Sequence, residues 1–68
     1  MSKMKTHIAQ YRKERGMSQE ELALLVGVRR ETISRLEKGL YNPSLKLAYD
    51  LSKVFGVTIE ELFQFEEN

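Results

Sequence analysis

Residues 18–38 read SQEELALLVGVRRETISRLEK, and this segment indicates the architecture more strongly than any other part of the chain. It opens with a capping-box pattern, in which Ser18 is the predicted N-cap of a helix and Glu21 is its third residue. Gly27 ends that helix, and a second short helix is predicted over about Arg30–Lys38. Two short helices joined by a glycine-containing turn can cross at a steep angle, which leaves one face of the second helix free.

Three further helices are predicted around this pair, because apolar residues recur at spacings of three and four while Pro and Gly are scarce. One spans about Thr6–Arg15, another begins after the N-cap Ser44, and a short one is opened by a second capping box, Thr58 to Glu61. The apolar faces of these helices carry Ile8, Leu22, Ala23, Val26, Val28, Ile33, Leu36, Leu47, Ala48, Leu51, Val54, Phe55, Ile59, Leu62 and Phe63, and most of these residues are expected in the core.

The outward face of the second short helix indicates a partner. With Ile33 and Leu36 pointing inward, its outward positions are Arg30, Glu31, Ser34, Arg35 and Lys38. Arginine can bind guanine bidentately in a DNA major groove, and lysine can contact phosphate. The pattern therefore favours DNA as the partner, and the alternative is a merely solvated charged face.

Charge distribution points the same way. The net charge is only +1, but residues 1–38 hold nine Lys and Arg against five Asp and Glu, whereas residues 39–68 hold two against five. A basic N-terminal half and an acidic C-terminal half are typical of a small protein that binds a polyanion. The length of 68 residues allows one small domain, with no separate catalytic or effector domain.

Composition excludes several functional classes. The chain has no Cys and one His, so disulfides, thiolate metal sites and a thiol nucleophile are excluded, and neither metal nor cofactor is expected. Catalysis is not expected either. The acidic pairs Glu20-Glu21 and Glu60-Glu61 belong to capping boxes, and His7 is the single histidine and has no second group with which to form an acid–base pair. The longest apolar run is five residues, too short to cross a membrane. A soluble, cytoplasmic protein is expected.

Several separated motifs resemble the Cro/C1 family of phage repressors, and especially its small stand-alone members of the cytolysin-repressor type. They are Met17–Ala23, Gly27-Val28, Thr32–Gly39, Tyr41–Leu45 and Gly56–Phe63. The resemblance implies an all-α, five-helix, lambda-repressor-like DNA-binding domain over residues 1–68, with its core at about 5–63 and its helix-turn-helix at about 18–38. It also implies a homodimer. Some such relatives pair their termini as two short antiparallel strands, here Met4-Lys5 with Phe63–Phe65.

The resemblance also carries over residue roles. Base contacts are implied for Arg30, Glu31, Ser34 and Arg35. Phosphate contacts are implied for Ser18, Gln19, Arg29, Lys38, Tyr41 and Asn42, and Gln19 is also implied to brace the recognition helix. Two alternatives remain: Gln19 as a plain first-turn residue without a DNA contact, and Tyr41 as a ring packed over the corner before the fourth helix. Arg12 and Glu37 resemble a partly buried ion pair. Arg29 stands where relatives often have Ser or Thr, so a side-chain N-cap is lost.

Three points stay open at this level. Glu31 can accept a hydrogen bond from cytosine, pair with Arg35 one turn later, or do neither. Leu24 and Leu25, where relatives often carry polar residues, either lie exposed or widen the core. Apolar surface for a dimer interface is expected at Ile59, Phe63 and Phe65, and the alternative for Phe63 is a place in the core.

The sequence therefore predicts a transcriptional regulator that binds a palindromic operator as a homodimer, with double-stranded DNA as its partner, and represses by blocking the promoter. The alternative is the antitoxin of a toxin–antitoxin pair, which binds its toxin and its own promoter.

Overall fold

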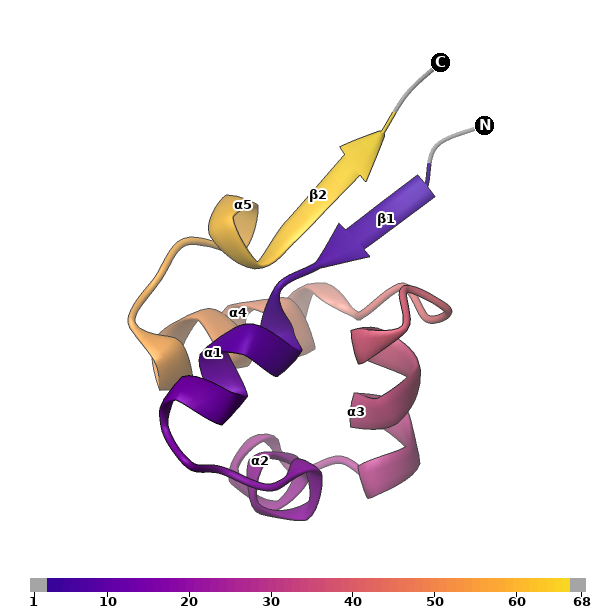
Figure 1. Cartoon of the computed structure of the whole chain (residues 1–68). Helices are drawn as coiled ribbons and strands as arrows, with labels where there is room; N and C mark the ends of the chain where they lie inside the picture. Colours follow the sequence, from indigo (N-terminus) through magenta and orange to yellow (C-terminus); the bar gives the residue numbers. More distant parts are fainter. Residues whose placement is uncertain (1–2, 67–68) are drawn as a thin grey trace.

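The computed structural model describes residues 3–66 (Figure 1). Within this range the elements follow in the order β1 (Lys3–Thr6), α1 (Ile8–Glu14), α2 (Gln19–Val26), α3 (Arg30–Glu37), α4 (Leu45–Phe55), α5 (Ile59–Leu62) and β2 (Phe63–Glu66). The two strands form an antiparallel ribbon that projects from the helices and carries both ends of the chain (Figure 1). The five predicted helices and the predicted terminal strand pair are thus confirmed.

Local sequence signals set the helix boundaries. Ser18 and Thr58 form complete capping boxes with the residues three positions later, and the hydroxyl of Ser44 accepts from Leu47 N at 3.1 Å. In the first box, Ser18 N–H donates to Glu21 Oε1 at 2.8 Å. This backbone donor, and then the Ser18 hydroxyl, lowers the pKa of Glu21 from its ordinary value. The box therefore contributes stability at neutral pH that is lost as the pH falls through that lowered pKa.

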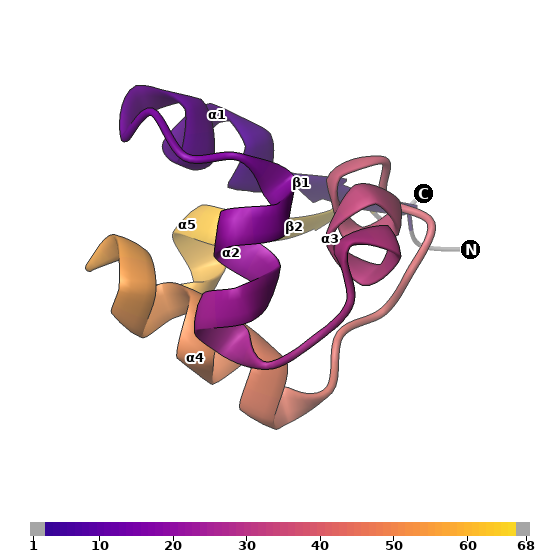
Figure 2. The same cartoon turned by 90° about the horizontal axis from the view of Figure 1, so that it is seen from below.

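The core lies where the helices meet. Its buried side chains are Ile8, Leu22, Ala23, Ile33, Leu36, Leu47, Ala48, Leu51, Phe55, Leu62 and Phe63. The helix α2 packs against α3 and α4, and α1 packs against α3 (Figure 2). Because the other helices hold α3 by its inner face, the outer face of α3 stays open to solvent.

The predicted start of the first helix at about Thr6 is wrong by two residues, since α1 begins at Ile8. The backbone of Thr6 belongs to β1, where it pairs with Phe63 of β2. His7 N–H then donates to the carbonyl of Leu62 at 2.9 Å, which holds the chain at the turn from strand to helix. Pairing with a distant strand has replaced the first helical turn.

Two leucines of α2 lie outside the core. Leu24 is 78% exposed and Leu25 is 61% exposed, so these residues do not widen the core. In the part of the chain that is described, no helix is long and apolar enough to cross a membrane.

Candidate nucleic-acid interface

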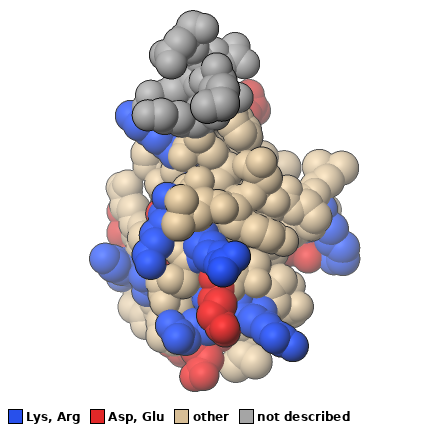
Figure 3. Space-filling model, turned by 90° about the vertical axis from the view of Figure 1, so that its right-hand side faces the viewer, with Lys and Arg blue, Asp and Glu red and all other residues tan. Residues whose placement is uncertain are grey.

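The outer face of α3 carries a cluster of charged side chains. Arg30, Glu31, Arg35 and Lys38 are exposed, and Ser34 between them is half-buried. Figure 3 shows basic side chains gathered over this face, with acidic side chains among them. The whole array stands on one short helix whose opposite side is anchored by the buried Ile33 and Leu36.

Arg29 precedes this helix as its N-cap. Its side chain makes no capping hydrogen bond, as the sequence predicted, and it lies exposed beside Arg30. The helix therefore begins with two adjacent cations on its open side.

A largely buried ion pair ties α3 to α1. Arg12 Nε lies 2.6 Å from Glu37 Oε2, and the two side chains are only 11% and 9% exposed. Arg12 Nη2 also donates to Glu37 Oε1 at 3.3 Å, and its Nη1 donates to the carbonyl of Met17 at 2.8 Å. One guanidinium thus fixes both the end of α3 and the chain that leads into α2.

Gln19, the first residue of α2, extends this network toward the open face. Its Nε2 donates to Glu37 Oε1 at 2.8 Å. Its Oε1 accepts from Arg30 Nη1 at 3.5 Å, a long contact between exposed groups. The resemblance implied that Gln19 braces the recognition helix, and this contact joins it to Arg30, 11 positions along the chain.

The pairing of Glu31 with Arg35 that their spacing allows is not formed. Among residues 3–66 these two side chains make no ion pair with each other, although both are exposed on the same helix. An isolated pair of this spacing is worth only about 0.2–0.5 kcal/mol, too little to hold two solvated side chains together. Glu31 is left free to meet another group.

Candidate phosphate contacts flank α3 on both sides. Ser18 is exposed and Gln19 half-buried at the start of α2, and Lys38 is exposed at the end of α3. Tyr41, 40% exposed, and the exposed Asn42 lie in the following loop, so Tyr41 is not sealed into the corner before α4. The Ser18 hydroxyl accepts from Glu21 N at 3.0 Å and, after the Ser18 backbone N–H, lowers the pKa of Glu21, so the capping box already engages it.

Two of the basic residues counted among residues 1–38 stabilise the fold. Arg12 is only 11% exposed and is held in the ion pair with Glu37. Arg15 Nη2 donates to the carbonyl of Phe55 at 2.7 Å, and its guanidinium lies 5.1 Å from the centre of the Phe55 ring and 5.8 Å from that of Tyr11. The structure thus assigns both residues to the packing of α1, and they do not add to the charge offered by α3.

This geometry coincides with a family match. The family model described as helix-turn-helix matches residues 8–62, which span α1 through α5. The chain belongs to the Cro/C1-type helix-turn-helix family. It is a transcriptional regulator with a helix-turn-helix DNA-binding domain of the lambda-repressor-like type, α3 being the second helix of the motif.

Relatives agree with this assignment. An uncharacterized helix-turn-helix-type transcriptional regulator of Archaeoglobus fulgidus is 59% identical over 64 residues, which cover 94% of this chain and 91% of that protein. The restriction-modification controller protein C.AhdI from Aeromonas hydrophila has a TM-score of 0.73 at 31% identity, covering 81% and 83% of the two chains. The N-terminal DNA-binding domain of SinR from Bacillus subtilis has a TM-score of 0.71 at 40% identity, covering 79% and 80%.

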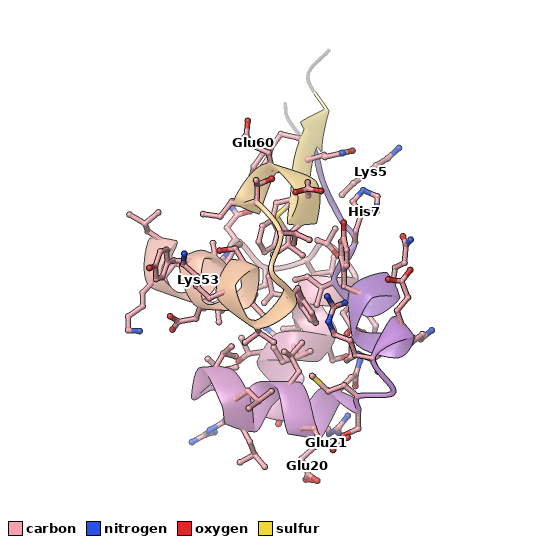
Figure 4. All side chains as sticks on the ribbon, turned by 90° about the vertical axis from the view of Figure 1, so that its left-hand side faces the viewer. Lys5, His7, Glu20, Glu21, Lys53 and Glu60 are labelled. Atoms are coloured by element: carbon pink, nitrogen blue, oxygen red, sulfur yellow. The ribbon has the colours of Figure 1, made fainter. Side chains whose placement is uncertain are left out.

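Members of this helix-turn-helix family are DNA-binding regulators, not enzymes. On the face opposite α3, Figure 4 shows His7 close to Lys5, while Glu20, Glu21 and Glu60 lie apart from them on α2 and α5. In the range covered by the structure, no group of three His, Asp or Glu side chains is placed to hold a metal ion.

A separate apolar groove of about 320 Å³ lies on the helix-turn-helix domain, between the start of α4, α5 and the terminal ribbon. Its lining includes Met4, Leu45, Ile59, Phe63 and Phe65. Leu45 is 81% exposed and Phe65 is 60% exposed. The prediction that Phe63 also offers exposed apolar surface is wrong: it is 6% exposed, because it packs with Leu62 into the core and leaves only an edge in the groove.

Proposed function

We propose that this protein is a cytoplasmic repressor that binds a palindromic operator as a homodimer, with α3 of each copy in the major groove. The observation that carries the proposal is the open face of α3, where Arg30 and Arg35 are exposed and Lys38 lies at the helix end. A helix of this width fits the major groove, where arginine can bind guanine bidentately. A repressor of this kind acts by occupying a promoter.

Base reading is assigned to Arg30, Glu31, Ser34 and Arg35. Glu31 is free of Arg35 and exposed, so its carboxylate can accept a hydrogen bond from the N4 amino group of cytosine. Phosphate contacts are assigned to Ser18, Gln19, Arg29, Lys38, Tyr41 and Asn42, which surround α3 at both ends. Such contacts set the orientation on the duplex and supply most of the salt-dependent affinity.

Dimerisation is assigned to the apolar groove. A single small domain covers one half-site, which supplies too few base contacts for useful specificity. Leu45 and Phe65 expose apolar side chains around the groove, and Ile59 lies within it, so a second copy would remove this surface from water. The two α3 helices are then expected about 34 Å apart, one turn of the duplex.

The decisive experiment selects bound sites from random duplex DNA and measures the size of the protein by sedimentation. We expect an inverted-repeat site and a species of twice the 8.0 kDa chain mass. Recovery of no preferred sequence would contradict specific binding. A single half-site bound by a stable monomer at micromolar concentration would contradict the homodimer.

Lys38→Ala tests the phosphate contacts. Lysine bound to phosphate contributes equally on every sequence, so the variant should weaken binding to operator and to unrelated DNA by the same factor. It should also reduce the slope of log affinity against log salt by about 1. Lys53→Ala is the matched control, because Lys53 is an exposed cation of α4 on the face opposite α3 (Figure 4). A slope equal to that of the parent would remove Lys38 from the interface.

A further inference from the structure

We infer that two copies of this chain associate by strand pairing: the outer edge of β2 pairs with β2 of a second copy about a two-fold axis at Phe65. The two terminal ribbons then form one four-stranded antiparallel sheet. The inference deepens the proposed dimerisation and rests on it, because it adds backbone hydrogen bonds at a strand edge to the apolar contacts of the groove.

The hydrogen-bond pattern of the ribbon determines which backbone groups face outward. His7 N–H donates to the carbonyl of Leu62 at 2.9 Å, and bonded and non-bonded pairs alternate along antiparallel strands. Met4 and Phe65 are paired three positions further along, which is a non-bonded position in this alternation. The N–H and C=O groups of Met4 and Phe65 therefore point away from each other's strand, toward the two outer edges of the ribbon.

The outer edge of β1 is already occupied. The carbonyl oxygen of Met4 lies so near Gly39 that a Cβ on that residue would be 2.7 Å from it, so the loop after α3 covers this edge. The hydroxyl of Thr6 also donates to the carbonyl of Glu37 at 3.4 Å, at the end of α3. There is consequently no room for a further strand beside β1.

The outer edge of β2 is closed where the strand begins and open further along. Phe63 N–H donates to the carbonyl of Ile59, so α5 covers the first position of this edge. Beyond α5 the ribbon projects away from the helices (Figure 1), and Phe65 is 60% exposed. Phe65 is therefore the residue of β2 whose N–H and C=O both remain available to another strand.

An identical strand fits this short edge. With a two-fold axis at Phe65, each Phe65 N–H donates to the carbonyl of the other copy, so one residue supplies two hydrogen bonds. Phe65 also lines the apolar groove, so the two aromatic side chains meet on the face already assigned to dimerisation.

The sequence of β2 also favours pairing. It reads FQFE, without the proline or lysine that often keeps an edge strand unpaired. A two-stranded ribbon is only marginally stable by itself, whereas four strands support one another. Pairing through β2 therefore stabilises the ribbon and covers its remaining open edge.

The first test removes the hydrogen-bond donor and keeps every side chain. The chain of 68 residues is synthesised with and without an N-methyl group on Phe65, and sedimentation equilibrium gives the dimer dissociation constant of each. Because the two-fold axis doubles the change, both hydrogen bonds are lost. We expect the dissociation constant to rise by about 5- to 150-fold, the range of two net hydrogen bonds. The circular dichroism spectrum should be unchanged, since the Phe65 N–H points away from β1.

The second test is disulfide cross-linking, which locates the axis. The chain has no cysteine, so each single substitution reports one distance. In Phe65→Cys the two Cα atoms of a hydrogen-bonded pair lie about 5.5 Å apart, within reach of a disulfide. In Gln64→Cys, the matched neighbour on the other face of the sheet, they lie about 8 Å apart, beyond that reach. We expect a covalent dimer from Phe65→Cys in a glutathione redox buffer, and none from Gln64→Cys.

The outcomes separate this inference from the proposed homodimer. If N-methylation leaves the dissociation constant unchanged, the edge of β2 does not pair and the inference is overturned, while the homodimer stands. Cross-linking of Gln64→Cys in preference to Phe65→Cys, or of neither variant, would also overturn the pairing at Phe65. If the unmodified chain stays monomeric at micromolar concentration, the homodimer itself has failed, and strand pairing fails with it.

Discussion

Arg12→Met should lower the free energy of unfolding by about 3–5 kcal/mol, the usual cost of leaving one partner of a buried ion pair uncompensated. Glu37 would keep only the amide of Gln19 as a hydrogen-bond donor, while its side chain is 9% exposed. A domain of this length rarely draws more than about 3–5 kcal/mol of stability from its core. We therefore expect the variant to be largely unfolded at room temperature, as measured by urea titration with circular dichroism.

The double variant Arg12→Met with Glu37→Met should recover much of that loss. It removes the orphaned carboxylate and puts two flexible apolar side chains of similar length in the same space. Lys13→Met serves as a control, because Lys13 is the exposed neighbour of Arg12 on α1. If Arg12→Met alone were as stable as Lys13→Met, the buried pair would contribute nothing to folding.

Gly39→Ala should destabilise the domain for two separate reasons. Gly39 has a φ of +73°, a left-handed conformation that costs other residues about 1–2 kcal/mol. In addition, a Cβ at this position would lie 2.7 Å from the carbonyl oxygen of Met4 in β1. That oxygen is backbone, so relief requires β1 to move away from the end of α3, and we expect a further loss of about 1–3 kcal/mol. Thermal unfolding of the variant measures the sum.

Gly56→Ala measures the cost of the left-handed backbone conformation alone. Gly56 has nearly the same φ, +68°, but a Cβ there would meet nothing within 4 Å. The difference between the two variants therefore reports the contact between the loop after α3 and β1. Equal destabilisation by Gly39→Ala and Gly56→Ala would show that this close approach has no energetic weight.

Much of the fold was predictable because its signals are local. Ser18 and Glu21, or Thr58 and Glu61, meet across one helical turn, so three-residue spacing is enough to place the start of α2 and α5. The inward face of α3 follows in the same way from Ile33 and Leu36, and its outward face from what remains. Helical spacing alone therefore identifies Arg30 and Arg35 as exposed candidate contacts.

The predictions that failed concern residues whose environment is set by distant parts of the chain. Thr6 lies within the helical spacing of Met4, Ile8 and Tyr11, yet it pairs with Phe63 of β2 as part of a strand. Phe63 fits an exposed apolar edge as well as a core position, and only the packing of α5 and β2 makes it buried. The spacing of Glu31 and Arg35 permits an ion pair but does not compel one.

The sequence by itself determined the five helices, their caps and the charged face of α3, because each depends on residues within about one helical turn of one another. Only the tertiary structure decided which residues hold the charged face of α3 in place. The contacts from Glu37 to Arg12 and to Gln19 join residues 25 and 18 positions apart, and Gly39 lies against the carbonyl of Met4 in β1. Such contacts have no periodicity along the chain, since they exist only once the helices have packed around a common core.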